Sequence, residues 1–139
     1  CLTHNQVVQL ARSWGYEIGR RWGESFHLDP FTPRNNLLRQ DLPSEGEERK
    51  VLLKVGAKWK LELIISCAVK SPVEGWYNQP EHEWFVLLRG SANLRIKDPD
   101  GNIDLSVGDH MYFPPHRLHR VERTDPAPGT IWLALSWME

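Results

Sequence analysis

Apolar and polar side chains alternate with a period of two along most of the chain after residue 49. In the run 59–69 the odd-numbered positions are apolar, while Lys60 and Glu62 stand on the other face, which predicts a half-buried antiparallel strand. Shorter runs of the same type predict strands at 83–88, 92–97, 103–106, 110–113, 119–123 and 130–137. Turns rich in Gly, Pro and Asp separate these runs. Short strands at this spacing predict an all-β sandwich or barrel.

The first 24 residues follow a different pattern, that of a short helix. Thr3 and Gln6 have the spacing of a capping box, in which each side chain accepts a hydrogen bond from the other residue's backbone amide. Four apolar positions then recur at helical spacing: Val7, Leu10, Ala11 and Trp14. We expect two parts, a helical extension at 1–24 and a barrel at 25–139. The extension is either the end of a truncated small helical domain or a helix that flanks the barrel.

The composition limits the kind of protein. A chain of 139 residues with 40% hydrophobic and 25% charged residues is typical of one soluble globular domain. The formal net charge of −1 offers no basic field for nucleic acid, and no apolar run approaches the ~20 residues of a membrane span, so we expect neither partner. Cys67 lies in an apolar strand, far from Cys1 in sequence, which favours a free thiol and a cytoplasmic protein.

Two short motifs indicate a more specific fold. Residues 83–90 read Glu, six residues, then Gly. Eighteen residues after Gly90 comes Gly108, followed by five residues, Pro114 and, five positions further on, His119. Together these motifs resemble the paired motifs of the cupin superfamily, over about residues 75–137. The resemblance implies an all-β double-stranded β-helix, or jelly-roll barrel, of a small single-barrel cupin with a degenerate first motif.

The resemblance also implies a candidate metal site. In metal-binding cupins the first motif supplies His-x-His and then a Glu, and the second motif supplies a last His. Glu83 matches that Glu and His119 matches the last His. The two positions of the His-x-His pair carry other residues in either spacing of the motif: Tyr77 and Gln79, or Trp76 and Asn78. The three-histidine set of the family is therefore incomplete in this chain.

One of the two spacings brings several polar side chains to one face. The residues that share the parity of Glu83 are Tyr77, Gln79 and Glu81, and His119 is expected across from them. The resemblance implies a divalent ion held by Glu83, His119, Gln79 and Tyr77, with Glu81 as an additional donor. This set of ligands does not distinguish Zn, Fe, Mn and Ni. The alternative is a degenerate cupin whose hydrogen-bonded pocket holds water or an organic ligand.

His116 is the candidate catalytic residue, three positions before His119 in the turn that leads to the last motif strand. If the side chain reaches the pocket, a histidine there suits acid–base chemistry or substrate binding near neutral pH. The alternative is a solvated histidine in a surface turn.

The motifs and the residues support two functional hypotheses. The first is a cupin barrel that binds a divalent metal and a small polar metabolite; isomerisation and dioxygenation are the common chemistries of the family, and the sequence does not choose between them. The second is a non-catalytic ligand-sensing or partner-binding module without metal. By analogy with cupins we also expect a homodimer that pairs sheet edges. Residues 5–18 are similar to the latter part of the helical domain in the nitrogen-fixation-associated leader-peptide family.

Overall fold

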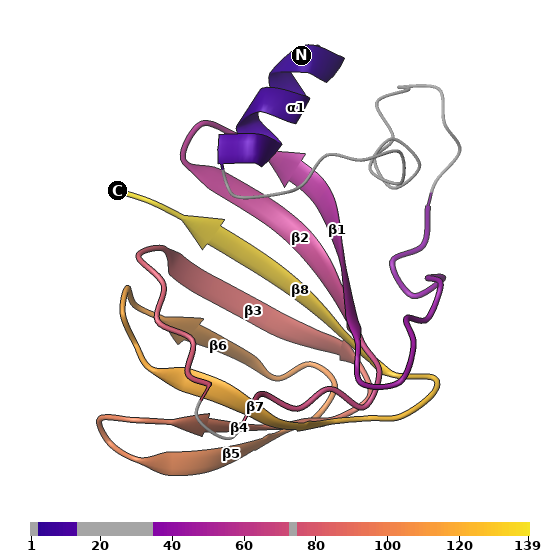
Figure 1. Ribbon diagram of the computed structural model, residues 1–139, viewed down its shortest axis with the longest axis vertical. Helices are drawn as coiled ribbons and strands as arrows, with labels where there is room; N and C mark the ends of the chain where they lie inside the picture. The colour runs from indigo at the N-terminus through magenta and orange to yellow at the C-terminus, as the bar shows by residue number, and fades with distance from the viewer. Residues whose placement is uncertain (1–2, 14–34, 73–74) are drawn as a thin grey trace.

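The computed structural model describes residues 3–13, 35–72 and 75–139, which contain one helix and eight strands (Figure 1). The elements are α1 (His4–Ser13), β1 (Glu48–Val55), β2 (Trp59–Ser66), β3 (His82–Arg89), β4 (Ala92–Ile96), β5 (Gly101–Leu105), β6 (His110–Phe113), β7 (His119–Thr124) and β8 (Thr130–Trp137). Every strand predicted from the alternating pattern is confirmed, with ends that differ by a few residues. None of the helices in this part of the chain is both long enough and apolar enough to cross a membrane.

The strands form two antiparallel sheets. The larger sheet has the order β1-β2-β8-β3-β6, and the smaller has the order β5-β4-β7. Figure 1 shows the smaller sheet below the larger one, with the chain crossing repeatedly between them. The last strand, β8, pairs with both β2 and β3, so strands far apart in sequence close the larger sheet. This is the two-sheet jelly-roll arrangement that the motifs implied.

The inner faces of the two sheets enclose the main core. β8 lies in the middle of the larger sheet, where the register places Ala134 beside Glu62 of β2 and Phe85 of β3. Because side chains alternate along a strand, Leu133 and Leu135 point to the other face. The core cluster between the sheets consists of Phe85, Leu87, Ala92, Leu94, Leu105, Phe113, Trp132 and Ala134.

The second half of β2 is more deeply buried than predicted, because residues of both faces are covered there, whereas Trp59 at its start is 40% exposed. Its apolar face lies on the outside of the larger sheet, in a second buried cluster against which Leu37 packs: Val51, Leu63, Ile65 and Ile131. Its polar face points between the sheets, where Glu62 is 3% exposed. The strand also ends at Ser66 rather than at residue 69, and Ala68 has a left-handed φ of 50°.

The N-terminal helix packs on the larger sheet. The capping box is confirmed, because the Thr3 amide donates to Gln6 Oε1 at 2.8 Å and the Gln6 amide donates to Thr3 Oγ1 at 3.2 Å. The apolar stripe of α1 forms a cluster with the end of β1: Val7, Ala11, Leu52 and Val55. The predicted boundary between residues 24 and 25 and the contribution of Trp14 fall outside the described residues.

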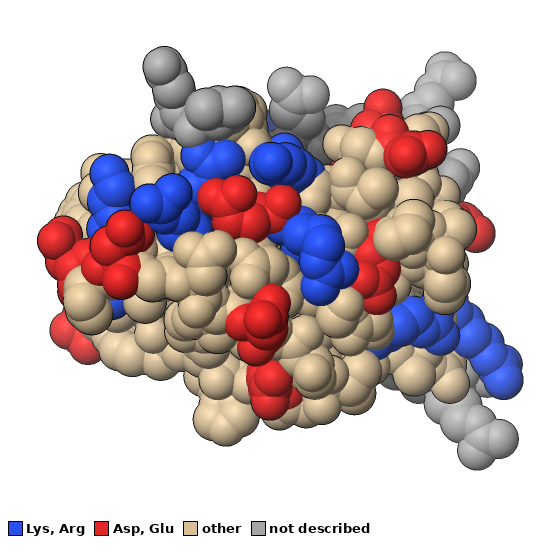
Figure 2. Space-filling model, turned by 90° about the horizontal axis from the view of Figure 1, so that it is seen from below, with Lys and Arg blue, Asp and Glu red and all other residues tan. Residues whose placement is uncertain are grey.

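The outer face of the smaller sheet is polar. Figure 2, seen from the side of β4, β5 and β7, shows basic and acidic side chains interspersed on this face. Neighbouring charges pair there, as Arg123 does with Asp125 at 2.8 Å. The Lys97 ammonium lies 4.4 Å from the centre of the Trp76 ring, a cation–π contact that places Trp76 on the outside of the barrel.

Candidate functional site

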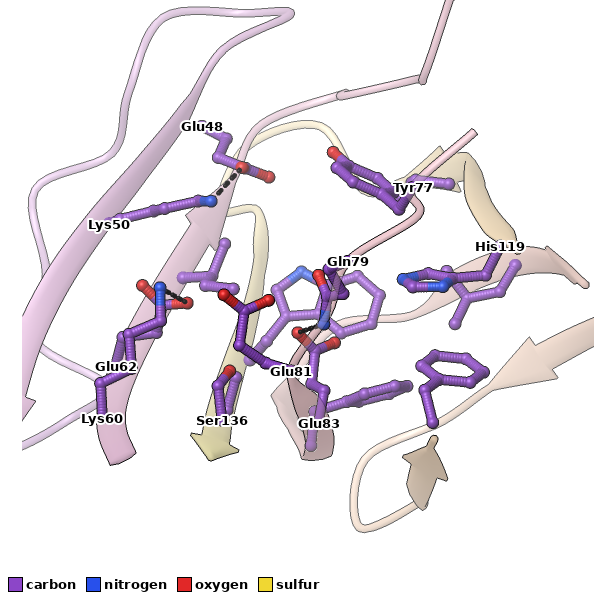
Figure 3. Close-up of a pocket in the computed structure, with 17 residues that line it drawn as sticks. Glu48, Lys50, Lys60, Glu62, Tyr77, Gln79, Glu81, Glu83, His119 and Ser136 are labelled. Carbon is purple, nitrogen blue, oxygen red and sulfur yellow. Dashed lines mark hydrogen bonds and ion pairs between the residues drawn. The ribbon is translucent and has the colours of Figure 1, made fainter. Parts of the chain in front are cut away.

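A cavity of about 130 Å³ lies between the two sheets. Its lining comes from both of them and from the segment before β3: Glu48, Lys50, Lys60, Glu62, Ile64, Tyr77, Gln79, Glu81, Glu83, Phe85, Leu94, Phe113, His119, Val121, Trp132, Ala134 and Ser136. A space of this size between the sheets can hold a small ligand. Figure 3 shows the polar side chains of these strands converging on that space.

Small residues on β8 leave room for the cavity. Ala134 is paired with Glu62 of β2, and Ser136 is paired with Glu83 of β3. Since neither Ala134 nor Ser136 has a long side chain, the carboxyl groups on the two flanking strands face a shared space above β8. Both β8 residues are buried, at 1% and 3% exposure. The position of β8 in the middle of the sheet therefore creates the site.

The residues predicted from strand alternation to face one side lie together in the structure. The backbones of Tyr77 and His119 form an isolated antiparallel bridge, in which the Tyr77 amide donates to the His119 carbonyl at 2.7 Å. Gln79 Nε2 donates to Glu83 Oε2 at 3.0 Å. Together with Glu81, these four residues line the cavity. The expectation that the five side chains share one space is confirmed; their role as metal ligands stays a prediction.

His119 is held in a fixed orientation. Its ring stacks on Phe113, with centroids 4.2 Å apart and planes 13° from parallel, and on Tyr77 at 5.4 Å. Its Nδ1 lies 2.8 Å from the Arg117 carbonyl oxygen. Because a carbonyl only accepts, Nδ1 carries the proton and donates, so that in the neutral ring Nε2 holds the lone pair and is the reactive nitrogen.

Tyr77, which is 42% exposed, is a weaker acid than a fully solvated tyrosine. Loss of solvent raises the pKa of the Tyr77 phenol, and the nearby carboxylates of Glu48 and Glu83 raise it further. A side-chain hydrogen bond with Ser71 acts on the pKa in the opposite direction, and the phenol keeps its proton at neutral pH as an ordinary tyrosine does.

Two cavity residues on β2 were missed as candidates from the sequence, Lys60 and Glu62. Burial raises the pKa of Glu62 to about 8, with a further contribution from the charge of Glu83. Burial also lowers the pKa of Lys60, whose Nζ lies 3.7 Å from Glu62 Oε1. Glu62 is thus a buried acid that retains its proton near neutral pH. The alternation of β2 does not indicate it, because alternation separates the two faces of the strand without showing which face points between the sheets.

The candidate catalytic residue His116 is not among the residues that line this cavity. It is exposed, in a turn, with a left-handed φ of 62°. Its Nδ1 lies 2.8 Å from Asn78 Oδ1, and its amide donates to the Gln79 carbonyl at 2.8 Å. These contacts fix the loop that carries Gln79, so His116 supports the cavity wall from outside. A catalytic role for His116 stays untested.

The residues present do not form a resident metal site by themselves. Within 3–13, 35–72 and 75–139, no group of three or more His, Cys, Asp or Glu side chains is placed to hold an ion. Glu83 and His119 are the two ordinary ligands, and the Gln79 amide uses its NH₂ group on Glu83. The donor set that the family places here is incomplete in the structure, as it is in the sequence.

The fold and its internal polar cavity define a single-barrel jelly-roll protein, and comparison with solved structures agrees. A "putative mannose-6-phosphate isomerase" from Ralstonia eutropha JMP134 is 31% identical, with a TM-score of 0.70, over 77% of this chain and 100% of that one. A cupin superfamily protein from Desulfitobacterium hafniense DCB-2 is 16% identical, with a TM-score of 0.64, over 81% and 95%. An RmlC-like cupin from Desulfovibrio desulfuricans is 19% identical, with a TM-score of 0.58, over 76% and 96%.

The chain belongs to the cupin superfamily. The all-β double-stranded β-helix implied by the two motifs is confirmed by these neighbours. No protein-family model matches the chain, and no curated protein matches it either. The similarity of residues 5–18 to a leader-peptide domain is not tested by these comparisons.

Proposed function

We propose that the cavity between the sheets binds a small polar metabolite. The observation that carries this proposal is the convergence of donors and acceptors from β1, β2, β3, β7 and the segment before β3 on one space between the sheets. Buried polar groups cost free energy unless something pairs with them, and a polar ligand would complete their hydrogen bonds.

The cavity also carries groups suited to proton transfer. His119 Nε2 is an acceptor on the smaller sheet, and Glu62 is a proton donor on the larger sheet. A base and an acid on facing walls are the groups that an isomerisation by proton transfer needs. The description of the Ralstonia eutropha protein as an isomerase is compatible with this chemistry. We therefore favour catalysis by proton transfer over a purely ligand-sensing role, in which the same cavity would bind a ligand without converting it.

Filling the cavity tests the binding proposal. Ala134→Leu adds three carbon atoms to its floor, and we expect ligand binding to fall by about a hundredfold or more, because the added volume overlaps the ligand. The measurement is ligand-observed NMR against a panel of sugars, sugar phosphates, amines and carboxylates. The matched control is Ala57→Leu, the same substitution at an exposed turn between β1 and β2. Equal binding by both variants, with circular dichroism showing both folded, would contradict the proposal.

A divalent metal ion is the finer expectation from the motifs and stays a prediction. Glu83 and His119 would be its anchors, with the remaining positions filled by oxygen donors of the wall or of a ligand. Elemental analysis of protein purified without chelator measures the metal content. A stoichiometric metal that disappears in the Glu83→Ala/His119→Ala double variant would support the metal site. Trace metal at the same level in the wild-type protein and the double variant would contradict the metal site.

A homodimer through sheet edges is proposed as well. The strand β6 pairs with β3 on one side and, among the described strands, with none on the other. Next to this edge lies an exposed aromatic surface, in which His82 stacks on Tyr112 at 5.9 Å and on Trp137 at 5.1 Å. Tyr112 is 49% exposed at this edge. Because a lysine on an edge strand discourages pairing, replacing Tyr112 by Lys tests the interface.

The oligomeric state is measured by sedimentation. The wild-type protein is expected to sediment as a dimer at micromolar concentration and Tyr112→Lys as a monomer. A wild-type protein that stays monomeric at high concentration would disprove the homodimer.

A cytoplasmic location is proposed from the cysteine chemistry. Cys67 is buried and free. A thiol that remains reduced inside a folded core is typical of a reducing compartment.

A further inference from the structure

Acidic side chains outnumber basic ones in the cavity. Its described lining includes four carboxyl groups, Glu48, Glu62, Glu81 and Glu83, and two lysines, Lys50 and Lys60. Each lysine lies near a carboxyl group of its own strand: Lys50 Nζ is 3.8 Å from Glu48 Oε1, and Lys60 Nζ is 3.7 Å from Glu62 Oε1. Glu48 thus competes with a ligand for the positive charge of Lys50, while burial lowers the pKa of Lys60 and disfavours its charged form.

The other two carboxyl groups have no lysine or arginine at ion-pair distance. Within the part of the chain that the structure describes, neither Glu81 nor Glu83 forms an ion pair. Glu83 accepts a hydrogen bond from Gln79, which is uncharged. Figure 3 shows the Glu81 carboxyl group pointing into the space between the Lys60–Glu62 pair and the Gln79–Glu83 pair. Two carboxylates therefore face the cavity outside the ion pairs of the described residues, with the charge of Lys60 acting on both from beyond ion-pair distance.

Aromatic rings make up much of the remaining wall. Tyr77, Phe113 and Trp132 line the same space as Glu81 and Glu83. Their apolar surface suits the carbon atoms of a ligand, and the carboxylates accept hydrogen bonds from a cationic group. An anion would instead approach Glu81 and Glu83 as a like charge, in surroundings where water screens the repulsion poorly.

We propose that the ligand of this cavity carries a protonated nitrogen, an aliphatic ammonium group that Glu81 and Glu83 bind together. This inference rests on the proposed function. The ammonium N–H groups donate to the two carboxylates, and the carbon atoms next to the nitrogen contact the aromatic wall. A sugar phosphate of the kind named for the Ralstonia eutropha protein has the opposite charge. The two proteins share a fold and, on this inference, differ in ligand class.

Probes of one length and different charge test the inference. We would measure the affinities of 1,4-diaminobutane, butane-1,4-diol and butanedioate, with mannose 6-phosphate as a further anion, by isothermal titration calorimetry at low salt. The diamine is expected to bind at least about tenfold more tightly than the diol, and neither anion is expected to bind more tightly than the diol.

Charge-removing variants assign the ammonium site. Glu81→Gln and Glu83→Gln are each expected to weaken diamine binding by about ten- to a hundredfold and to weaken diol binding much less, since each removes one charge-assisted hydrogen bond to the ammonium group. Glu47→Gln is the matched control, because Glu47 is exposed and does not line the cavity.

The outcomes separate this inference from the proposed function. Tighter binding of an anion that Ala134→Leu abolishes would overturn the ammonium ligand and leave the binding cavity in place. Diamine binding that Glu81→Gln and Glu83→Gln leave unchanged would do the same. If none of the four probes binds at millimolar concentration, the ammonium ligand is overturned, and the binding function is judged by the wider panel and the Ala134→Leu comparison.

Discussion

Replacing Glu62 by Gln is expected to stabilise the protein at pH 9 and to leave its stability nearly unchanged at pH 5. The Glu62 side chain lies between the sheets at 3% residue exposure, and burial raises its pKa from 4.5 to about 8. In the unfolded chain the group ionises near its ordinary pKa. The folded state therefore binds an extra proton between these two values.

The sign of the pH dependence follows from that proton. The contribution of Glu62 to the free energy of unfolding is fully present below pH 4.5 and is lost as the pH rises to about 8. A change in pKa from 4.5 to about 8 corresponds to at most about 5 kcal/mol at pH 9. Lys60, whose pKa is lowered, has an effect of opposite sign in a window just below 10.5. The glutamine side chain of the Glu62→Gln variant is uncharged throughout, so the difference between the two proteins isolates the carboxyl group.

Urea unfolding at pH 5, 7 and 9 measures this difference. The matched control is Glu45→Gln, a substitution of the same type at an exposed position. Parallel stability curves for the wild-type protein and Glu62→Gln across this range would show that Glu62 ionises normally in the folded protein.

Trp132→Ala is expected to destabilise the protein by about 3–5 kcal/mol. The indole is 7% exposed, packs its edge on Phe85 with centroids 5.4 Å apart, and donates from Nε1 to Ser66 Oγ at 3.1 Å. Removing it deletes the largest side chain of the core cluster and leaves Ser66 without this donor. Because Trp132 also lines the cavity, the variant enlarges the candidate site.

Trp137, five residues further along β8, provides the comparison. It stands on the outer face of the sheet and stacks on His82 with planes 6° apart. Trp137→Ala is expected to cost about 1 kcal/mol, because part of the ring is solvated in the folded protein. Thermal and urea unfolding of both variants give the two values. Equal losses would mean that the outer aromatic surface is as tightly packed as the core.

The positions of the strands were predictable from the sequence for a simple reason. Period-two alternation and turn residues act locally, so β3, β6 and β8 could be placed within a residue or so of their observed ends. The end of β2 was not predictable in this way, since the left-handed Ala68 stops a run whose alternation continues to residue 69.

About half of the candidate site could be predicted. Tyr77, Gln79, Glu81 and Glu83 follow from parity along one segment, and His119 follows from the second motif. Glu62 and Lys60 could not be recognised, because alternation shows that β2 has two faces but not which of them faces the barrel interior. His116 has motif spacing and still lies outside the cavity lining, because its turn points the side chain toward Asn78.

The sequence by itself determined the elements, the cupin jelly roll and the group of polar side chains that leads into β3, since all of these depend on local periodicity and motif spacing. Only the tertiary structure decided that β8 lies between β2 and β3, so that Ala134 and Ser136 leave a space between Glu62 and Glu83. That space, its surplus of carboxyl groups and the raised pKa of Glu62 arise from strands far apart in the chain. Burial and electrostatic interactions depend on distances between groups in the folded protein, and the spacing of residues along the sequence does not give those distances.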